Sequence, residues 1–112
     1  MDGSPSTRAE RAASALPMLP LPNTRTLAGE QLRGAACVWC AIPLTGESAR
    51  DLGERPGPDG VTIFPRGCAD CVRKEARRVY RLHKRGCERC TRNEEACLDR
   101  RALWDLALEG RR

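Results

Sequence analysis

Seven cysteines and one histidine are the residues of this 112-residue chain whose types and spacing could do chemistry. Six of the cysteines form three Cys-x-x-Cys pairs. Two thiolates separated by two residues can bind one ion from a single tight turn, and four soft ligands complete a tetrahedral zinc site. Cys37 and Cys40 are separated by 27 residues from Cys68 and Cys71, and these two pairs predict one structural zinc ion.

The same four cysteines have alternative interpretations, either a reduced buried cluster without metal or a pair of disulfides. A helix is expected to start at Cys68 and Cys71, and its positive dipole end favours thiolates there. The apolar stretch at 12–22 is short and broken by three prolines, so it fits neither a signal peptide nor a membrane span. We therefore expect a cytoplasmic protein that does not contact a membrane, in which thiols stay reduced and metal binding is favoured over disulfides.

A second group of four candidate ligands follows the first. His83, Cys87 and Cys90 have a compact spacing in which the end of one helix and the start of the next can converge on one ion, and Cys97 lies two turns into the expected second helix. These four residues predict a second zinc ion. The alternatives are that His83 packs in the core and that Cys97 packs as a small apolar residue near Trp104.

The composition predicts that the fold needs metal sites or disulfides for its stability. Leu, Ile, Val and Phe together make only 19 of the 112 residues, which is too few for an ordinary core to offset the ordering entropy of the chain. Small domains of this kind are usually held together by disulfides or by metal. The length allows one small module.

The positive charge is concentrated in one segment. The net charge is +5, and residues 72–86 alone carry seven Lys or Arg against one Glu, without Pro and with Gly only at position 86. The segment predicts an amphipathic helix with Val72, Ala76, Val79, Tyr80 and His83 on the inner arc. The outer arc carries the candidate nucleic-acid-binding residues Arg73, Lys74, Arg77, Arg78, Arg81, Lys84 and Arg85. Such one-sided charge indicates binding of phosphate backbones or of another anionic partner, and a solvated surface is the alternative. Tyr80 alone provides no stacking platform for bases.

These elements predict a small α+β domain stabilised by zinc. Residues 1–34 are expected to form a disordered tail, because their prolines interrupt any long helix. The zinc-binding domain is expected over 35–112, with a knuckle, a short β-hairpin and the basic helix in 35–85. The second cysteine cluster and a C-terminal helix from about Arg92 to Leu108 fill 86–112, with a capping box at Thr91 and Glu94.

The order knuckle, strand and helix resembles a treble-clef zinc finger over residues 35–85. The motif at His83, Cys87 and Cys90 resembles that of zinc-binding anti-sigma factors, which implies a transcription-associated protein partner as an alternative function. More broadly, the chain resembles small cysteine-rich, Ala/Arg-rich proteins of high-GC actinobacteria and their mobile elements, a likeness that implies no activity.

The chain is not expected to be an enzyme. A nuclease of the His-Asn-His kind, which some treble clefs carry, needs a general-base His on the hairpin and a second metal ligand, but the only His is His83. We therefore expect a non-enzymatic zinc module that presents its basic helix to DNA or RNA. One alternative is a protein partner that docks on an outward-facing Leu98 and Leu106, with Trp104 turned inward. The other alternative is a thiol redox switch.

Overall fold

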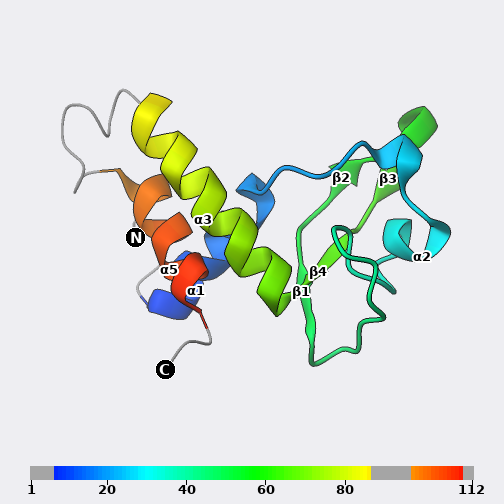
Figure 1. The fold of residues 1–112 in the computed structure, drawn as a ribbon, viewed down its shortest axis with the longest axis horizontal. Coiled ribbons are helices and arrows are strands. Elements are labelled where there is room, and N and C mark those ends of the chain that lie inside the picture. Colours follow the sequence, from blue (N-terminus) through cyan, green and yellow to red (C-terminus); the bar gives the residue numbers. More distant parts are fainter. Residues whose placement is uncertain (1–6, 87–96, 110–112) are drawn as a thin grey trace, which may run out of the picture. The chain divides into compact units, whose positions relative to one another are not determined.

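A computed structural model describes residues 7–86 and 97–109, and the side chains at 84–86 lie outside this description. Its helices are α1 (Arg8–Ala15), α2 (Gly29–Leu32), α3 (Ala69–Gly86) and α5 (Leu98–Leu108). Its strands are β1 (Ala49–Asp51), β2 (Arg55–Pro56), β3 (Thr62–Ile63) and β4 (Arg66–Cys68) (Figure 1). These elements confirm the expected α+β class. None of the described helices is long and apolar enough to cross a membrane.

The chain divides into two compact units, one of which is continuous and covers Leu16–Val72. Two small antiparallel sheets form this β unit: β1 pairs with β4, and β2 pairs with β3 through the turn at Pro58–Gly60. Pro58, Asp59 and Gly60 are typical turn residues, and Asp59 and Gly60 both adopt positive φ angles, of 57° and 78°. The fully buried side chains of the β unit include Leu19, Val38 and Leu52.

Arg55 fixes the segment that leads into this β unit. Its guanidinium donates hydrogen bonds to the carbonyl oxygens of Leu16, Leu19 and Leu52 at 3.1, 2.8 and 3.1 Å. Burial lowers the pKa of this guanidinium. One half-buried side chain thus satisfies three backbone acceptors and holds Leu16 and Leu19 against the core.

The second unit is helical, and its described residues are 7–15, 73–86 and 97–109. Helix α1 packs against α5, and Arg11 donates to the carboxylate of Asp105 at 2.7 Å. Small and branched side chains fill the core of this helical unit, namely Ala12, Ala15, Ala76, Cys97, Ala102, Leu103, Leu106 and Ala107. Small alanines allow close helix approach, so a unit with few large apolar residues still buries a continuous core.

Helix α3 forms where the basic segment predicts it and begins at Ala69, within the second cysteine pair, as expected. Val72 and Ala76 of the expected inner arc are buried at 1% and 0% exposure, whereas its other three residues, Val79, Tyr80 and His83, are half-buried. The boundary between the two units falls within this helix, after Val72. The boundaries expected at residues 34 and 85 therefore differ from those of the compact units.

The prediction of a disordered tail over 1–34 is wrong for residues 7–34. The prolines begin only at Pro17 within this range, so the preceding segment can form the short helix α1 without interruption. Beyond Pro17, Leu19 is fully buried and Gln31 is nine-tenths buried. Residues 1–6 lie outside the described residues.

The C-terminal helix also differs from its prediction. Within the described residues it begins at Leu98, and Cys97 occupies its N-cap position instead of lying two turns inside it. The expected capping box at Thr91 and Glu94 lies outside the described residues. The start at Leu98 changes which side chains of α5 share a face.

Candidate metal centre and basic helix

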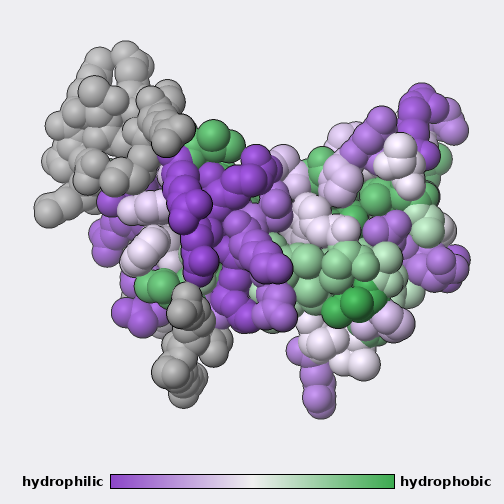
Figure 2. Space-filling view, viewed as in Figure 1, coloured by the Kyte–Doolittle hydropathy of each residue, from purple (hydrophilic) through white to green (hydrophobic). Residues whose placement is uncertain are grey.

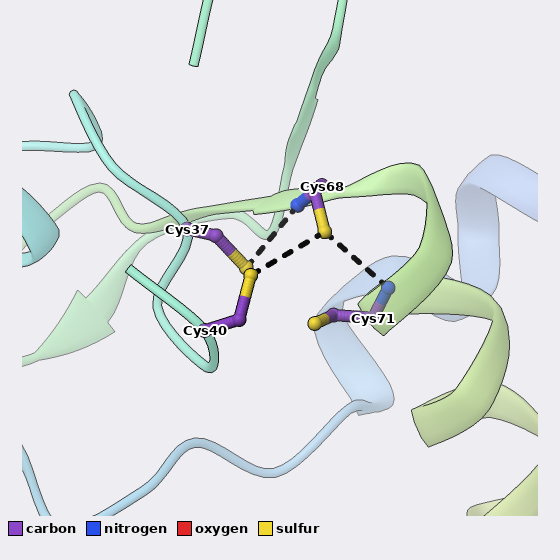
Figure 3. Close-up of side chains that lie close together, drawn as sticks. All are labelled: Cys37, Cys40, Cys68 and Cys71. Carbon is purple, nitrogen blue, oxygen red and sulfur yellow. Dashed lines mark hydrogen bonds between the residues drawn. The ribbon is translucent and has the colours of Figure 1, made fainter. Parts of the chain in front are cut away.

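The four cysteines of the first predicted site lie together in the β unit. The sulfur atoms of Cys37, Cys40, Cys68 and Cys71 are all within 4.8 Å of one another. Cys37 and Cys40 come from the knuckle loop, Cys68 ends strand β4, and Cys71 lies in the first turn of α3 (Figure 3). The cysteines among the described residues form no disulfide. The predicted first ligand set is therefore brought together as a reduced cluster.

The knuckle owes its shape to backbone hydrogen bonds. The Ala41 N–H donates to the Cys37 carbonyl oxygen at 2.8 Å, and the Cys37 N–H donates to Ile42 at 2.9 Å. An isolated β-bridge between Ala36 and Pro43 joins the two ends of this loop. Ala41 takes a φ of 66°, a left-handed conformation that costs an L-residue with a Cβ about 1–2 kcal/mol. This tight turn directs the sulfur atoms of Cys37 and Cys40 toward the start of α3.

Backbone amides also point at the sulfurs. The Cys68 N–H donates to the Cys37 sulfur at 3.3 Å, and the Cys71 N–H donates to the Cys68 sulfur at 3.4 Å (Figure 3). Such N–H···S bonds stabilise negative charge on sulfur. Burial alone would raise the pKa of Cys37, but hydrogen bonds from the backbone of Cys40, Cys68 and Trp39 bring this pKa down to about 7.

The other two resolved thiol shifts have the opposite sign. Burial, the largest cause, raises the pKa of both Cys68 and Cys71, and neighbouring sulfurs of the cluster raise the pKa of Cys71 further. Four sulfurs this close cannot all carry charge without a cation to offset their repulsion. A divalent ion supplies that offset, because coordination deprotonates thiols.

The arrangement fits a tetrahedral metal ion. Ligand sulfurs about 2.3 Å from a tetrahedral ion lie about 3.8 Å apart, and the Cys40 and Cys68 sulfurs are 3.8 Å apart. The widest separation, 4.8 Å, needs a contraction of only about 1 Å to reach the same geometry. A set of four thiolates is typical of structural metal sites that need no open coordination position.

Gln31 supports the knuckle, and sequence reasoning missed it. Its side-chain amide nitrogen donates to the carbonyl oxygens of Cys37 and Val38, both at 3.1 Å. Its amide oxygen accepts from the Ala28 N–H at 2.9 Å. All three bonds join a buried side chain to backbone, so Gln31 fixes the loop that carries two candidate ligands. Gln31 lies among other polar residues such as Glu30 and Arg33, so its sequence context carried no signal of this role.

Gly67 makes room for Trp39, one of the two residues between Cys37 and Cys40. A Cβ at Gly67 would lie 2.5 Å from the Trp39 ring and 3.0 Å from Val72. No side chain fits there without displacing the ring. The Trp39 ring therefore packs directly on strand β4, one residue before Cys68.

Two members of the second predicted ligand set also meet, in the helical unit. The His83 Nε2 lies 3.0 Å from the Cys97 sulfur, and Cys97 is fully buried. Their sequence separation is 14 residues, so the contact is tertiary. The remaining members, Cys87 and Cys90, lie outside the described residues.

Helix α3 presents a hydrophilic surface (Figure 2). Lys74, Arg78 and Arg81 are exposed, whereas Arg73 and Arg77 are half-buried. Arg73 donates to the Glu109 carbonyl oxygen at 3.4 Å, and Arg78 pairs with Glu75 at 2.8 Å. Hydrogen bonding to Glu75 raises the pKa of Arg78. The side chains of Lys84 and Arg85 lie outside the described ones.

The expected orientation of the α5 side chains is wrong for Leu106, one of the two residues of the predicted docking face, and for Trp104. Leu106 is fully buried, and Trp104, expected to face inward, is 45% exposed. Only Leu98, 58% exposed, points outward as expected. Trp104 would share a face with Cys97, seven residues earlier, if both belonged to the helix, but Cys97 is the N-cap and not part of it.

Searches against protein-family models, curated proteins and solved structures found no match to this chain.

Proposed function

We propose that the chain is a non-enzymatic zinc module that binds nucleic acid through helix α3. Four sulfurs within 4.8 Å of one another, drawn from a knuckle and a helix start, carry the metal part of this proposal. Zinc suits four thiolates in a closed tetrahedral set, where it supplies folding energy and no chemistry of its own. The reduced thiols that such a site needs suit a cytoplasmic location.

The nucleic-acid part rests on the charge of α3. Among the described residues, no carboxylate lies within ion-pair distance of Lys74, Arg77 or Arg81. Cations that are not neutralised by neighbours attract phosphates and release their counterions. The metal centre includes Cys71 in the first turn of α3, so it anchors the helix that would make these contacts.

The test is binding of labelled DNA and RNA across a series of salt concentrations. The double variant Lys74→Gln/Arg81→Gln should bind more weakly. The slope of the logarithm of its binding constant against the logarithm of the salt concentration should be shallower by about two units, one for each lost phosphate contact. The matched control is Arg25→Gln/Arg33→Gln, which removes two exposed charges from the β unit. Wild-type protein without salt-sensitive affinity for either nucleic acid would overturn this part of the proposal.

A second zinc ion at His83, Cys87, Cys90 and Cys97 is also proposed. The 3.0 Å contact between His83 and Cys97 supports it, because it brings a nitrogen ligand from α3 and a sulfur ligand from the N-cap of α5 together. Elemental analysis of protein purified under reducing conditions should give two zinc ions per chain. The variant His83→Ala should reduce this to one, and an unchanged content would overturn the second site.

A further inference from the structure

The helical unit has a hollowed surface around two aromatic rings. Two adjoining hollows, of about 510 and 340 Å³, share Tyr80 and Trp104. Six arginines from the described helices α1, α3 and α5 surround these rings: Arg8, Arg11, Arg77, Arg81, Arg100 and Arg101. We call these eight residues the aromatic–arginine face. Both volumes lie in the range of ligand pockets.

The rings are held in a defined geometry. Tyr80 from α3 and Trp104 from α5 have ring centroids 5.0 Å apart and planes inclined by 40°. Arg100 lies over the Tyr80 ring at 5.2 Å and also donates to its hydroxyl at 2.8 Å. Although Trp104 contacts Tyr80, 45% of its surface stays exposed. A fixed and accessible indole ring is the feature on which unpaired bases stack.

The charge around the rings is strongly positive. Asp105 is the one carboxylate that lines the hollows, and it is held by Arg11 at 2.7 Å and by Arg8 at 3.8 Å. Within the described part of the chain, Arg77, Arg81 and Arg101 have no carboxylate at ion-pair distance. Aromatic rings within such a cationic rim match a ligand that alternates flat bases with phosphates.

We propose that the aromatic–arginine face binds single-stranded nucleic acid, with an unpaired base stacked on Trp104 and the flanking phosphates held by the arginines. This inference rests on the proposed nucleic-acid binding and specifies its substrate class. A duplex keeps its bases stacked inside the helix and offers only phosphates to this face. The base-dependent part of binding is therefore what distinguishes this proposal from attraction by charge alone.

The experiment compares a short labelled oligothymidylate, an abasic strand with the same number of phosphates, and a duplex of the same length, using fluorescence anisotropy. The oligothymidylate should bind at least about 5-fold more tightly than the abasic strand, as expected for one stacked base. Trp104→Leu should remove this difference, whereas Trp104→Phe should keep most of it because a ring remains. Phe64→Leu is the matched control, since Phe64 is 56% exposed in the β unit.

Circular dichroism of the Trp104 variants provides the check on folding, and a folded Trp104→Phe protein suffices for the comparison. Equal, salt-sensitive binding of the abasic strand and the oligothymidylate would overturn the stacking proposal and leave binding through α3 intact. An equal loss in Trp104→Leu and Phe64→Leu would also overturn it. Absence of salt-sensitive binding to any of the three ligands would overturn both proposals.

Discussion

The side-chain amide of Gln31 donates a hydrogen bond to the carbonyl oxygen of Cys37, the first candidate metal ligand. The same amide group also bonds Val38 and Ala28. Short helix α2 is thereby fastened to the knuckle by one buried side chain. The position of two metal ligands thus depends on a residue that cannot itself contact the metal.

Replacing this amide should weaken the metal centre. Gln31→Leu leaves two buried carbonyl oxygens and one N–H without their present partner, which costs about 1–3 kcal/mol of unfolding free energy. We expect a lower midpoint in denaturant titration and a weaker zinc affinity in competition with a chelator. Glu30→Gln is the control, because Glu30 is exposed and its carboxylate lies 3.9 Å from the exposed Arg33 guanidinium. Equal stability of the two variants would contradict this role of Gln31.

A substitution at Ala41 is expected to increase the stability of the protein, whereas the substitution of Gln31 lowers it. Its φ of 66° is a conformation that glycine adopts without strain. Ala41→Gly should therefore stabilise the β unit by up to about 1 kcal/mol, since the relief of strain exceeds the added chain entropy. Ala41→Val should destabilise it, because a β-branched side chain fits this region worse. Thermal melting of the zinc-loaded proteins gives the order, and a less stable glycine variant would count against the strained turn.

Local spacing explains what was predictable from the sequence. The first cysteine cluster and the amphipathic character of α3 follow from residues a few positions apart, and both are present as expected. The pairing of Gln31 with the knuckle and of Arg55 with the carbonyl oxygens of Leu16 and Leu19 depends on tertiary contacts, which have no local signature. Those contacts order residues that proline content alone assigns to a tail.

The error at α5 has a simple geometric origin. Seven-residue spacing places two side chains on one face only if both belong to the helix. The helix starts at Leu98, so its buried stripe consists of Ala102, Leu103, Leu106 and Ala107 instead. Trp104 then lies beside the stripe and becomes available at the surface. The contact between Tyr80 and Trp104 was not visible in sequence because the two rings are 24 residues apart.

Gly67 should tolerate no side chain. In Gly67→Ala the new Cβ would meet the Trp39 ring at 2.5 Å, a distance that forces the ring or strand β4 to move. Overpacking of this kind typically costs about 1–3 kcal/mol. We expect a matching loss in unfolding free energy and a shifted Trp39 emission. Gly46→Ala is the control, because a Cβ there meets no atom within 4 Å. Equal melting temperatures of the two variants would show that the ring relaxes without cost.

A comparison of Cys37→Ser with Cys97→Ser should distinguish the two predicted metal sites, because each variant removes a ligand of only one site. Cys37 belongs to the cluster in the β unit, whereas Cys97 contacts His83 in the helical unit. Cobalt(II) titration reports thiolate ligands through their charge-transfer absorption, so each variant should lose the signal of one site and keep that of the other. Since metal binding to four thiolates is coupled to folding, Cys37→Ser should also increase amide exchange in 36–44 and 66–71. The exchange rates of α1 and α5 should stay close to those of the wild type in that variant. A Cys37→Ser protein that keeps full cobalt absorption and unchanged exchange in the knuckle would refute the four-cysteine metal centre.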